Sequence, residues 1–190
     1  MVDRVFDEVF PSSARNASSV HWTPVEVAVR AAHLLAGRRG ATILDIGAGV
    51  GKFCLVAAAT KMDLRVRGVE HRSHFVAVAR DAAKAMNVDV DFVHGTLDDH
   101  AAREVDGVYL FNPFAENLCP PEDRLDDSVE CSEMRFWRDI RRTERLLERA
   151  PVGTRVVTYC GWGGSMPPEY HLHLREARGG TIELWVKSDT

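Results

Sequence analysis

The sequence predicts an α/β fold: one domain with a doubly wound, mainly parallel sheet of seven strands that ends in an antiparallel hairpin. Three observations predict it. Short apolar runs alternate with helical patterns, with turn residues between them and no internal repeat. The last two runs are instead joined by Arg178-Gly179-Gly180, which is typical of two adjacent strands. With 190 residues of average globular composition, the chain can bury a full core as a single domain.

Residues 1–22 are predicted to form an arm that packs over an opening, ahead of the main domain at 23–190. Apolar residues at helical spacing begin the arm: Val2, Val5, Phe6, Val9 and Phe10. The serine-rich stretch after them is expected to be mobile. A helix then begins at Thr23-Pro24-Val25-Glu26, where Thr caps, Pro takes the first helical position and Glu reaches back toward the cap.

The remaining elements follow in alternation. Ser73 is expected to cap the third helix of the main domain and Asn87 to end it. Including the helix that begins at Thr23, the expected helices span residues 23–36, 52–60, 73–86 and 131–150. The expected strands span residues 41–46, 65–70, 89–94, 105–111, 154–160, 170–177 and 181–187.

Charge and cysteine usage argue against several functional classes. The chain has 24 Lys and Arg against 28 Asp and Glu, a net charge of −4, which disfavours a general grip on nucleic acid. Its four cysteines form no CxxC pair, so we expect neither a metal site nor a redox motif. No apolar run approaches the roughly 20 residues of a membrane span. We therefore expect a cytoplasmic protein with no membrane partner.

The most specific motif is Asp45-Ile46-Gly47-Ala48-Gly49-Val50-Gly51, between an expected strand and an expected helix. Alternate glycines allow a tight turn and the close approach of a ligand, and the helix N-terminus beyond offers N–H groups and a positive dipole end. Glu70 ends the next expected strand, 19 residues after Gly51. An acid at that distance can reach the ribose hydroxyls of a bound nucleoside.

By these motifs and its element order, the chain resembles the class I S-adenosylmethionine-dependent methyltransferases over residues 23–187. The alternative is an ordinary dinucleotide fold, whose last glycine would fall at Lys52. The resemblance implies S-adenosylmethionine as cofactor, with Asp45 on its amino group and Glu70 on its ribose. The cofactor-binding residues it implies are Asp45, Gly47, Ala48, Gly49, Gly51, Glu70, His71, Thr96, Leu97 and Asn112.

The contact to adenine stays open between two residues. After the third strand the family usually has Gly-Asp, whereas this chain has Gly95-Thr96-Leu97-Asp98. Either Thr96 accepts from the adenine amino group while Leu97 packs on the purine, or Asp98 takes the polar role. A turn that caps the next helix is an equal alternative for Asp98.

Asn112-Pro113-Phe114 ends the fourth strand and is predicted to be the reaction centre. An Asn amide oxygen and a carbonyl beside proline can accept two hydrogen bonds from an NH₂ group, and Phe114 would supply an apolar or cation–π wall. The run resembles a shortened Asn/Asp-Pro-Pro-aromatic motif of methyltransferases that act on adenine or glutamine nitrogens. A plain strand-to-loop exit is the alternative.

Residues 113–133 carry seven acids and only one base, Arg124. This acidic connection would steer a cationic substrate and act as a lid, or it is simply a solvated loop. Thr23-Pro24 and Gly153-Thr154-Arg155-Val156-Val157 also resemble small class I protein-lysine methyltransferases. Together these features favour a small or protein-borne amine acceptor. Aromatic residues that line its channel, or else the edge of the core, are Trp22, Tyr159 and Trp162; bases suggested by proximity are His94, Tyr109 and Glu116.

Two other functions remain as alternatives. Arginines share one face of the helix at 131–150, which would contact RNA or face solvent: Arg135, Arg138, Arg142, Arg145 and Arg149. An RNA or nucleobase N-methyltransferase is therefore possible, though not favoured. The second alternative is a catalytically silent module that only binds the cofactor. The sequence predicts neither the number of methyl groups added nor the oligomeric state.

Overall fold

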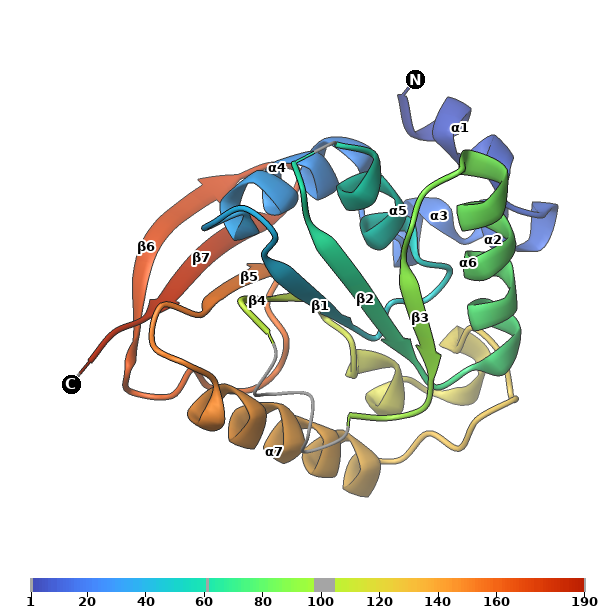
Figure 1. The fold of residues 1–190 in the computed structure, drawn as a ribbon. Coiled ribbons are helices and arrows are strands. Elements are labelled where there is room, and N and C mark those ends of the chain that lie inside the picture. The colour runs from blue at the N-terminus through green and yellow to red at the C-terminus, as the bar shows by residue number, and fades with distance from the viewer. Residues whose placement is uncertain (1, 61, 98–104, 190) are drawn as a thin grey trace.

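The computed structural model describes residues 2–60, 62–97 and 105–189, and it confirms the predicted fold (Figure 1). Its strands are β1 (Thr42–Ile46), β2 (Arg65–Glu70), β3 (Asp91–His94), β4 (Gly107–Phe111), β5 (Arg155–Tyr159), β6 (Tyr170–Ala177) and β7 (Thr181–Lys187). They form one sheet in the order β3-β2-β1-β4-β5-β7-β6. β1 to β5 are parallel, and β7 is inserted antiparallel between β5 and β6.

Helices cover both faces of the sheet (Figure 1). The main-domain helices are α4 (Val25–Leu35), α5 (Lys52–Ala59), α6 (Ser73–Met86) and α7 (Glu133–Arg149). Buried residues of α4, α5 and α6 share one core cluster, whereas α7 contributes Phe136, Ile140 and Leu147 to a second cluster on the other face. Central strands such as β4 are therefore apolar on both sides. None of the helices in the described ranges is both long and apolar enough to span a bilayer.

The strand order reverses between β1 and β4, which lie side by side with Asp45 opposite Tyr109. At such a switch point the connections after the two strands diverge and leave a crevice at the carboxyl edge of the sheet. The glycine loop follows β1 and Asn112 follows β4, so both lie at this crevice.

The start of α4 differs from the prediction. The Thr23 hydroxyl is buried and lies 3.1 Å from the Tyr109 hydroxyl, so it does not cap the helix. Instead the Val25 N–H donates to the carboxylate of Asp3 at 2.8 Å. The predicted capping box is wrong because a partner from the N-terminal arm takes its place.

The arm is helical throughout most of its length. It comprises α1 (Val2–Phe6), the 3₁₀ turn η1 (Asp7–Val9), α2 (Ser12–Asn16) and α3 (Ser18–His21). The expectation of a mobile serine-rich stretch is wrong, since Ser12 and Ser18 begin α2 and α3. Phe10 is 2% exposed and anchors the arm in the core, whereas Val2 and Val5 face solvent.

The far end of α7 is closed by a lysine from the last strand. Lys187 is buried, and its ammonium donates to the carbonyls of Leu147, Glu148 and Ala150 at 3.2, 2.6 and 2.9 Å. These are carbonyls that a helix C-terminus leaves without intrahelical partners, and the positive charge matches the negative end of the helix dipole.

Candidate functional site

The glycine loop requires glycine at its tightest contacts. Gly47 and Gly49 have φ of +74° and +56°. A Cβ at Gly47 would lie 2.8 Å from the Cβ of Pro113, and one at Gly49 would lie 2.5 Å from the ring of Trp22. Both positions therefore combine a left-handed backbone with a neighbour that leaves no room for a side chain.

Glu70 is joined directly to this loop. Its carboxylate, 5% exposed, accepts from the Gly49 N–H at 2.9 Å and from the Arg72 N–H at 2.8 Å. Burial raises the pKa of Glu70, opposed by these hydrogen bonds and by the charge of Arg72. A carboxylate has about four acceptor positions, so it retains capacity for two ligand hydroxyls.

The N–H groups of Gly47, Ala48 and Gly49 already have hydrogen-bond partners within the protein. Those of Gly47 and Ala48 donate to the carbonyl of Val69 at 2.9 and 3.0 Å, and that of Gly49 donates to Glu70. Polar contacts to a ligand must therefore come mainly from carboxylates beside the loop.

The second of these carboxylates is Asp45, at the end of β1. It is 4% exposed and accepts from the Cys54 thiol at 3.2 Å. Burial, together with the nearby charge of Glu70, raises its pKa to about 7. A buried carboxyl group with a raised pKa favours a cationic ligand group, because the positive charge would stabilise its ionised form.

Three cavities occupy the crevice. The largest of them, the central cavity, has a volume of about 260 Å³ and is lined by His21, Trp22, Glu70, Arg72, Asn112 and Glu116 among others. The inner cavity, about 30 Å³, is lined by Asp45, Ala48, Lys52 and Tyr109 among others. The lateral cavity, also about 30 Å³, is lined by His71, Thr96, Leu97, Phe114 and Asp139 among others.

The predicted cofactor residues that the structure describes thus lie at one edge of the sheet, but they do not all line the same cavity. Gly51 sits behind the loop as the N-cap residue of α5, with φ of +79°. His71 lines both the central and the lateral cavity, and burial lowers its pKa to about 4. Thr96 and Leu97 line the lateral cavity, while Asp98 lies outside the described residues.

Asn112 turns the chain out of β4 in a left-handed conformation with φ of +42°. Its N–H donates to the Gly161 carbonyl at 3.0 Å. Within the described residues its exposed side-chain amide has no hydrogen-bond partner, and it lines the central cavity. A strained non-glycine residue with a free amide at a cavity is typical of a functional position.

The other two residues of the motif lie differently. Pro113 borders both the central and the lateral cavity. Phe114 is 8% exposed, packs in the core cluster of α7, and lines the lateral cavity. The structure therefore does not place Phe114 as a wall of the central cavity, where it was predicted to contact an acceptor. That part is taken by Trp22, Phe75 and Phe111.

The N-terminal arm covers the site. Trp22 is buried, donates from Nε1 to the Ala14 carbonyl at 2.8 Å, and packs edge-on against Phe75. Behind it Lys52, 2% exposed, forms ion pairs of 2.7 Å with both Asp3 and Asp7. The buried lysine therefore fastens the arm to the start of α5.

The acidic connection is fastened as well. Arg72 is 3% exposed and pairs with Glu116 at 2.8 Å and with Asp126 at 3.1 Å. The pKa of Asp126 falls to about 2 because Ser128 and Arg72 donate to it. Two of the acids predicted to steer a substrate are thus neutralised within the protein, which leaves Asp123 beside Glu116 at the central cavity.

Other predicted candidates are held away from the central cavity. Tyr109 is buried with its hydroxyl near Thr23, and burial raises its pKa well above the usual range. His94 contacts the carbonyl of His71. Tyr159 packs on Phe111 and donates to the Arg178 carbonyl. Trp162 is in the core cluster of α7.

The arginine face of α7 is partly engaged. Arg135, Arg138 and Arg142 all lie within 3.6 Å of the carboxylate of Asp139, and Arg142 also donates to Thr96. One buried acid therefore gathers three guanidinium groups and offsets only one of their three positive charges. Asp139 also borders the lateral cavity, a placement that the sequence pattern did not indicate.

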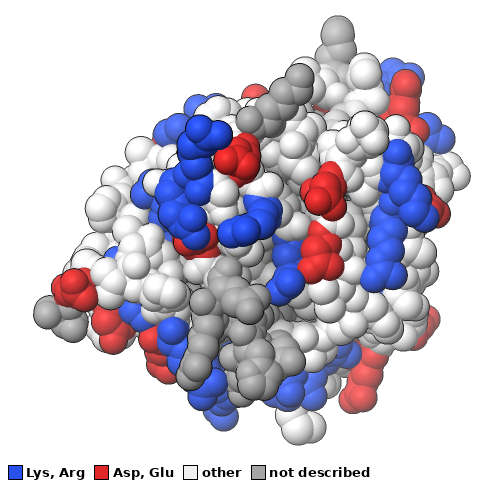
Figure 2. Space-filling model, in the orientation of Figure 1, with Lys and Arg blue, Asp and Glu red and all other residues white. Residues whose placement is uncertain are grey.

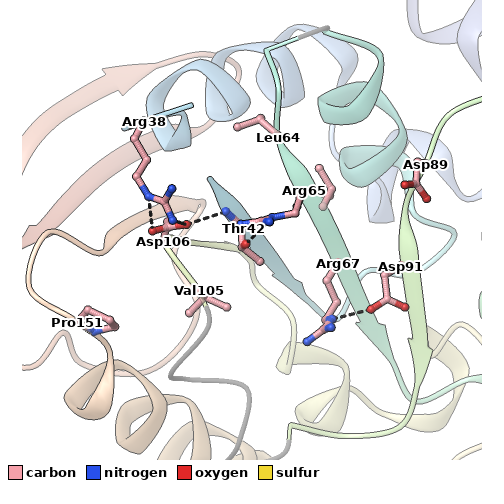
Figure 3. A pocket seen from close by; sticks show the side chains of 11 residues that line it. Arg38, Thr42, Leu64, Arg65, Arg67, Asp89, Asp91, Val105, Asp106 and Pro151 are labelled. Carbon is pink, nitrogen blue, oxygen red and sulfur yellow. Dashed lines mark hydrogen bonds and ion pairs between the residues drawn. The ribbon is translucent and has the colours of Figure 1, made fainter. Parts of the chain in front are cut away.

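A larger hollow, with a volume of about 670 Å³, lies at the opposite, amino edge of the strands (Figure 3). Arg38 pairs with Asp106 and Arg67 with Asp91, each at 2.7 Å. Its charged lining is three arginines and three aspartates, Arg38, Arg65, Arg67, Asp89, Asp91 and Asp106. Figure 2 shows acidic side chains beside the basic ones on this face. With its charges balanced, and at the edge where ligands of such sheets do not bind, this hollow is not the candidate site.

Comparisons with known proteins match part of the chain to one family model. Residues 43–130, from β1 through the acidic connection, match the family model described as a methyltransferase domain. No curated protein sequence matches the chain.

Solved structures share the whole architecture. TrmN from Thermus thermophilus aligns with a TM-score of 0.68 and 18% identity, over 98% of this chain and 53% of its own. An RNA methyltransferase from Salinibacter ruber, in complex with S-adenosyl-L-homocysteine, gives 0.61 and 23% over 88% and 94%. A putative O-methyltransferase from Klebsiella pneumoniae gives 0.64 and 14% over 97% and 90%. The chain spans about half the length of TrmN, and at these identities the likeness establishes the fold.

Proposed function

We propose that the chain carries a class I S-adenosylmethionine-dependent methyltransferase domain and that it transfers the cofactor's methyl group to a nitrogen of a small or protein-borne amine, such as a lysine. The observation that carries this proposal is the lining of the central cavity. There the free amide of Asn112 lies in the same cavity as three carboxylates, Glu70, Glu116 and Asp123, and one guanidinium, Arg72, so the lining keeps a net negative charge after Arg72 has paired with Glu116. Acceptor groups and negative charge suit an amine better than an anionic or neutral acceptor.

The residues at the crevice fit the cofactor. Asp45 is a buried carboxylate suited to an ammonium group, and Glu70 retains acceptor positions for a ribose diol. Leu97 and Ile46 offer apolar contact in the lateral cavity, which suits a purine. When bound, S-adenosylmethionine supplies an electrophilic methyl group on a sulfonium. The chain's part is to hold the acceptor nitrogen in line with that methyl and to exclude water.

Replacing Glu70 with glutamine is expected to weaken cofactor affinity by about 10- to 100-fold, because charge-assisted hydrogen bonds of about 1.5–3 kcal/mol are lost. Calorimetry with S-adenosylhomocysteine measures this. Burial raises the pKa of Glu70 above its ordinary 4.5. As the pH is lowered, the cofactor affinity of the wild-type protein should therefore begin to fall at a higher pH than it would if the binding glutamate were exposed. Glu26→Gln, at an exposed position on α4, is the control. Equal affinity in the Glu70 and Glu26 variants would remove Glu70 from the site.

Replacing Asn112 with glycine is expected to lower turnover by about 100-fold and to lower cofactor affinity much less, because the amide mainly positions the acceptor. Glycine keeps the left-handed turn, so the loss reports the side chain and not backbone strain. Asn112→Asp retains an acceptor oxygen and should keep more activity than the glycine variant. If both variants turn over at the wild-type rate, the motif is only a strand exit.

Transfer of labelled methyl groups tests the acceptor class. The panel comprises poly-L-lysine, spermidine, a histone mixture and transfer RNA, each incubated with the purified protein and labelled S-adenosylmethionine. Labelling of the amine-bearing probes supports the proposal. Labelling of RNA alone would replace it with the nucleobase alternative, and cofactor binding without transfer to any probe would favour a silent binding module.

A further inference from the structure

His21 lies where the central and inner cavities meet. It ends α3 and lines both cavities, together with Trp22, Gly47 and Phe111. Gly47 follows β1 directly, and Phe111 immediately precedes Asn112. The arm therefore brings an imidazole to the point where the glycine loop and the Asn112 turn approach each other.

The His21 imidazole is free to act there. It is half-buried and packs against Trp22 with ring centroids 6.0 Å apart, but within the described residues it has no hydrogen-bond partner. Burial lowers its pKa, the charge of Arg72 lowers it further, and the charge of Glu116 opposes both. At neutral pH the ring is uncharged and one of its nitrogens presents a lone pair.

The other groups at the central cavity are less suited to take up a proton. Glu70 is engaged by two backbone N–H groups, and Glu116 is paired with Arg72 and accepts from the Leu125 N–H. The low pKa of His71, about 4, makes that imidazole a weak base. Charged groups that line the two cavities with His21 are Asp45, Lys52, Glu70, Arg72, Glu116 and Asp123, and the other titratable ones are His71, Tyr109, Cys119 and Cys131.

We propose that His21 accepts the proton that the acceptor amine must lose before methyl transfer, an inference that rests on the proposed nitrogen acceptor. The ammonium form of the acceptor gives one proton to the imidazole and regains its lone pair. The nitrogen–carbon bond then forms as the sulfur–carbon bond breaks, and that electron pair stays on sulfur as a neutral thioether. The products are a methylated ammonium and an imidazolium, which the Glu116 carboxylate stabilises until its proton passes to water.

Replacing His21 with glutamine tests this role. With poly-L-lysine or spermidine as probe, turnover at pH 7 is expected to fall by about 100-fold, while the affinity for S-adenosylhomocysteine stays unchanged. The defect should shrink toward pH 10, because the amine then loses its proton to water unaided. Added imidazole should partly restore turnover in His21→Ala. His33→Gln, an exposed histidine bonded only within α4, is the control and should match wild type.

Each other outcome decides against a specific claim. A His21→Gln variant with the wild-type pH profile overturns the proton-acceptor role. Parallel loss of turnover and cofactor affinity, without imidazole rescue, assigns His21 to fastening the arm instead. If the wild-type protein binds S-adenosylhomocysteine but methylates no amine probe, the proposed acceptor class fails first and this inference falls with it.

Discussion

Replacing Asp45 with asparagine is expected to stabilise the cofactor-free protein at pH 8 while abolishing its binding of S-adenosylmethionine. Asp45 is fully enclosed, and its pKa of about 7 lies above the 3.8 of an ordinary aspartate. A carboxyl whose pKa is raised on folding contributes stability below its unfolded pKa, and that contribution is lost as the pH rises through about 7. Above that pH the fold carries a buried charge whose only hydrogen-bond donor in the described chain is the Cys54 thiol.

Asparagine has nearly the same shape and no charge, and its amide oxygen can still accept from Cys54. The free energy of unfolding should therefore rise by about 1–4 kcal/mol at pH 8, and by about a third as much at pH 5, because the loss begins near the unfolded pKa. The cofactor's ammonium would lose its counter-charge, with an expected affinity loss of about 100-fold or more. Urea unfolding at both pH values and calorimetry measure the two effects.

Asp91→Asn is the matched control, since Asp91 is an exposed aspartate at the opposite end of the sheet. It should show neither the pH-dependent gain nor the loss of affinity. Destabilisation of Asp45→Asn by the same amount at pH 5 and pH 8 would mean that the carboxylate is not strained by burial. Retained affinity would show that another group holds the cofactor's ammonium.

Replacing Lys52 with methionine is expected to detach the N-terminal arm. The lysine is 2% exposed and pairs with Asp3 and Asp7, so its removal leaves two carboxylates without their counter-charge. Breaking a buried ion pair from one side costs about 3–5 kcal/mol. Trp22, at the end of the arm, packs against Gly49, so detachment of the arm should also open the central cavity. The closed cavity has a volume of about 260 Å³, below the roughly 300–1,000 Å³ that is usual for small-molecule pockets.

Limited proteolysis and Trp22 fluorescence follow the arm, and stopped-flow mixing measures the rate of cofactor association. The Lys52→Met variant should be cleaved within residues 2–22 and should bind the cofactor faster. The double variant Lys52→Met/Asp7→Asn should be less destabilised than Lys52→Met alone, because one uncompensated charge is gone. Lys84→Met, at an ion pair 79% exposed on both sides, is the control. An intact arm in Lys52→Met would contradict this account.

The sequence predicted those elements whose signals are local. β2, α6 and both strands of the terminal hairpin have the predicted bounds, because a clear hydrophobic period ends at turn residues in each case. Failures occur where the deciding partner is distant in the chain. Asp3 displaces Thr23 as the cap of α4, and packing against α4 and α6 orders an arm whose composition indicated mobility.

The same distinction between local and distant partners applies to the contacts of the site. The contact between Glu70 and Gly49 was predictable, because adjacent parallel strands must end at one edge. No local pattern indicates that Cys54 binds Asp45, that Asp139 reaches the lateral cavity, or that Phe114 turns into the core. His21 was missed for the same reason, although its place beside an apolar tryptophan in the arm was a weak signal.

Lys187 links the end of α7 to β7, which is synthesised after it. Because its ammonium holds the final turn of α7, that turn is completed only after the last strand has left the ribosome and paired. α7 begins at Glu133, at the end of the acidic connection, so the helix that follows this connection is anchored at both ends only once β7 has been made.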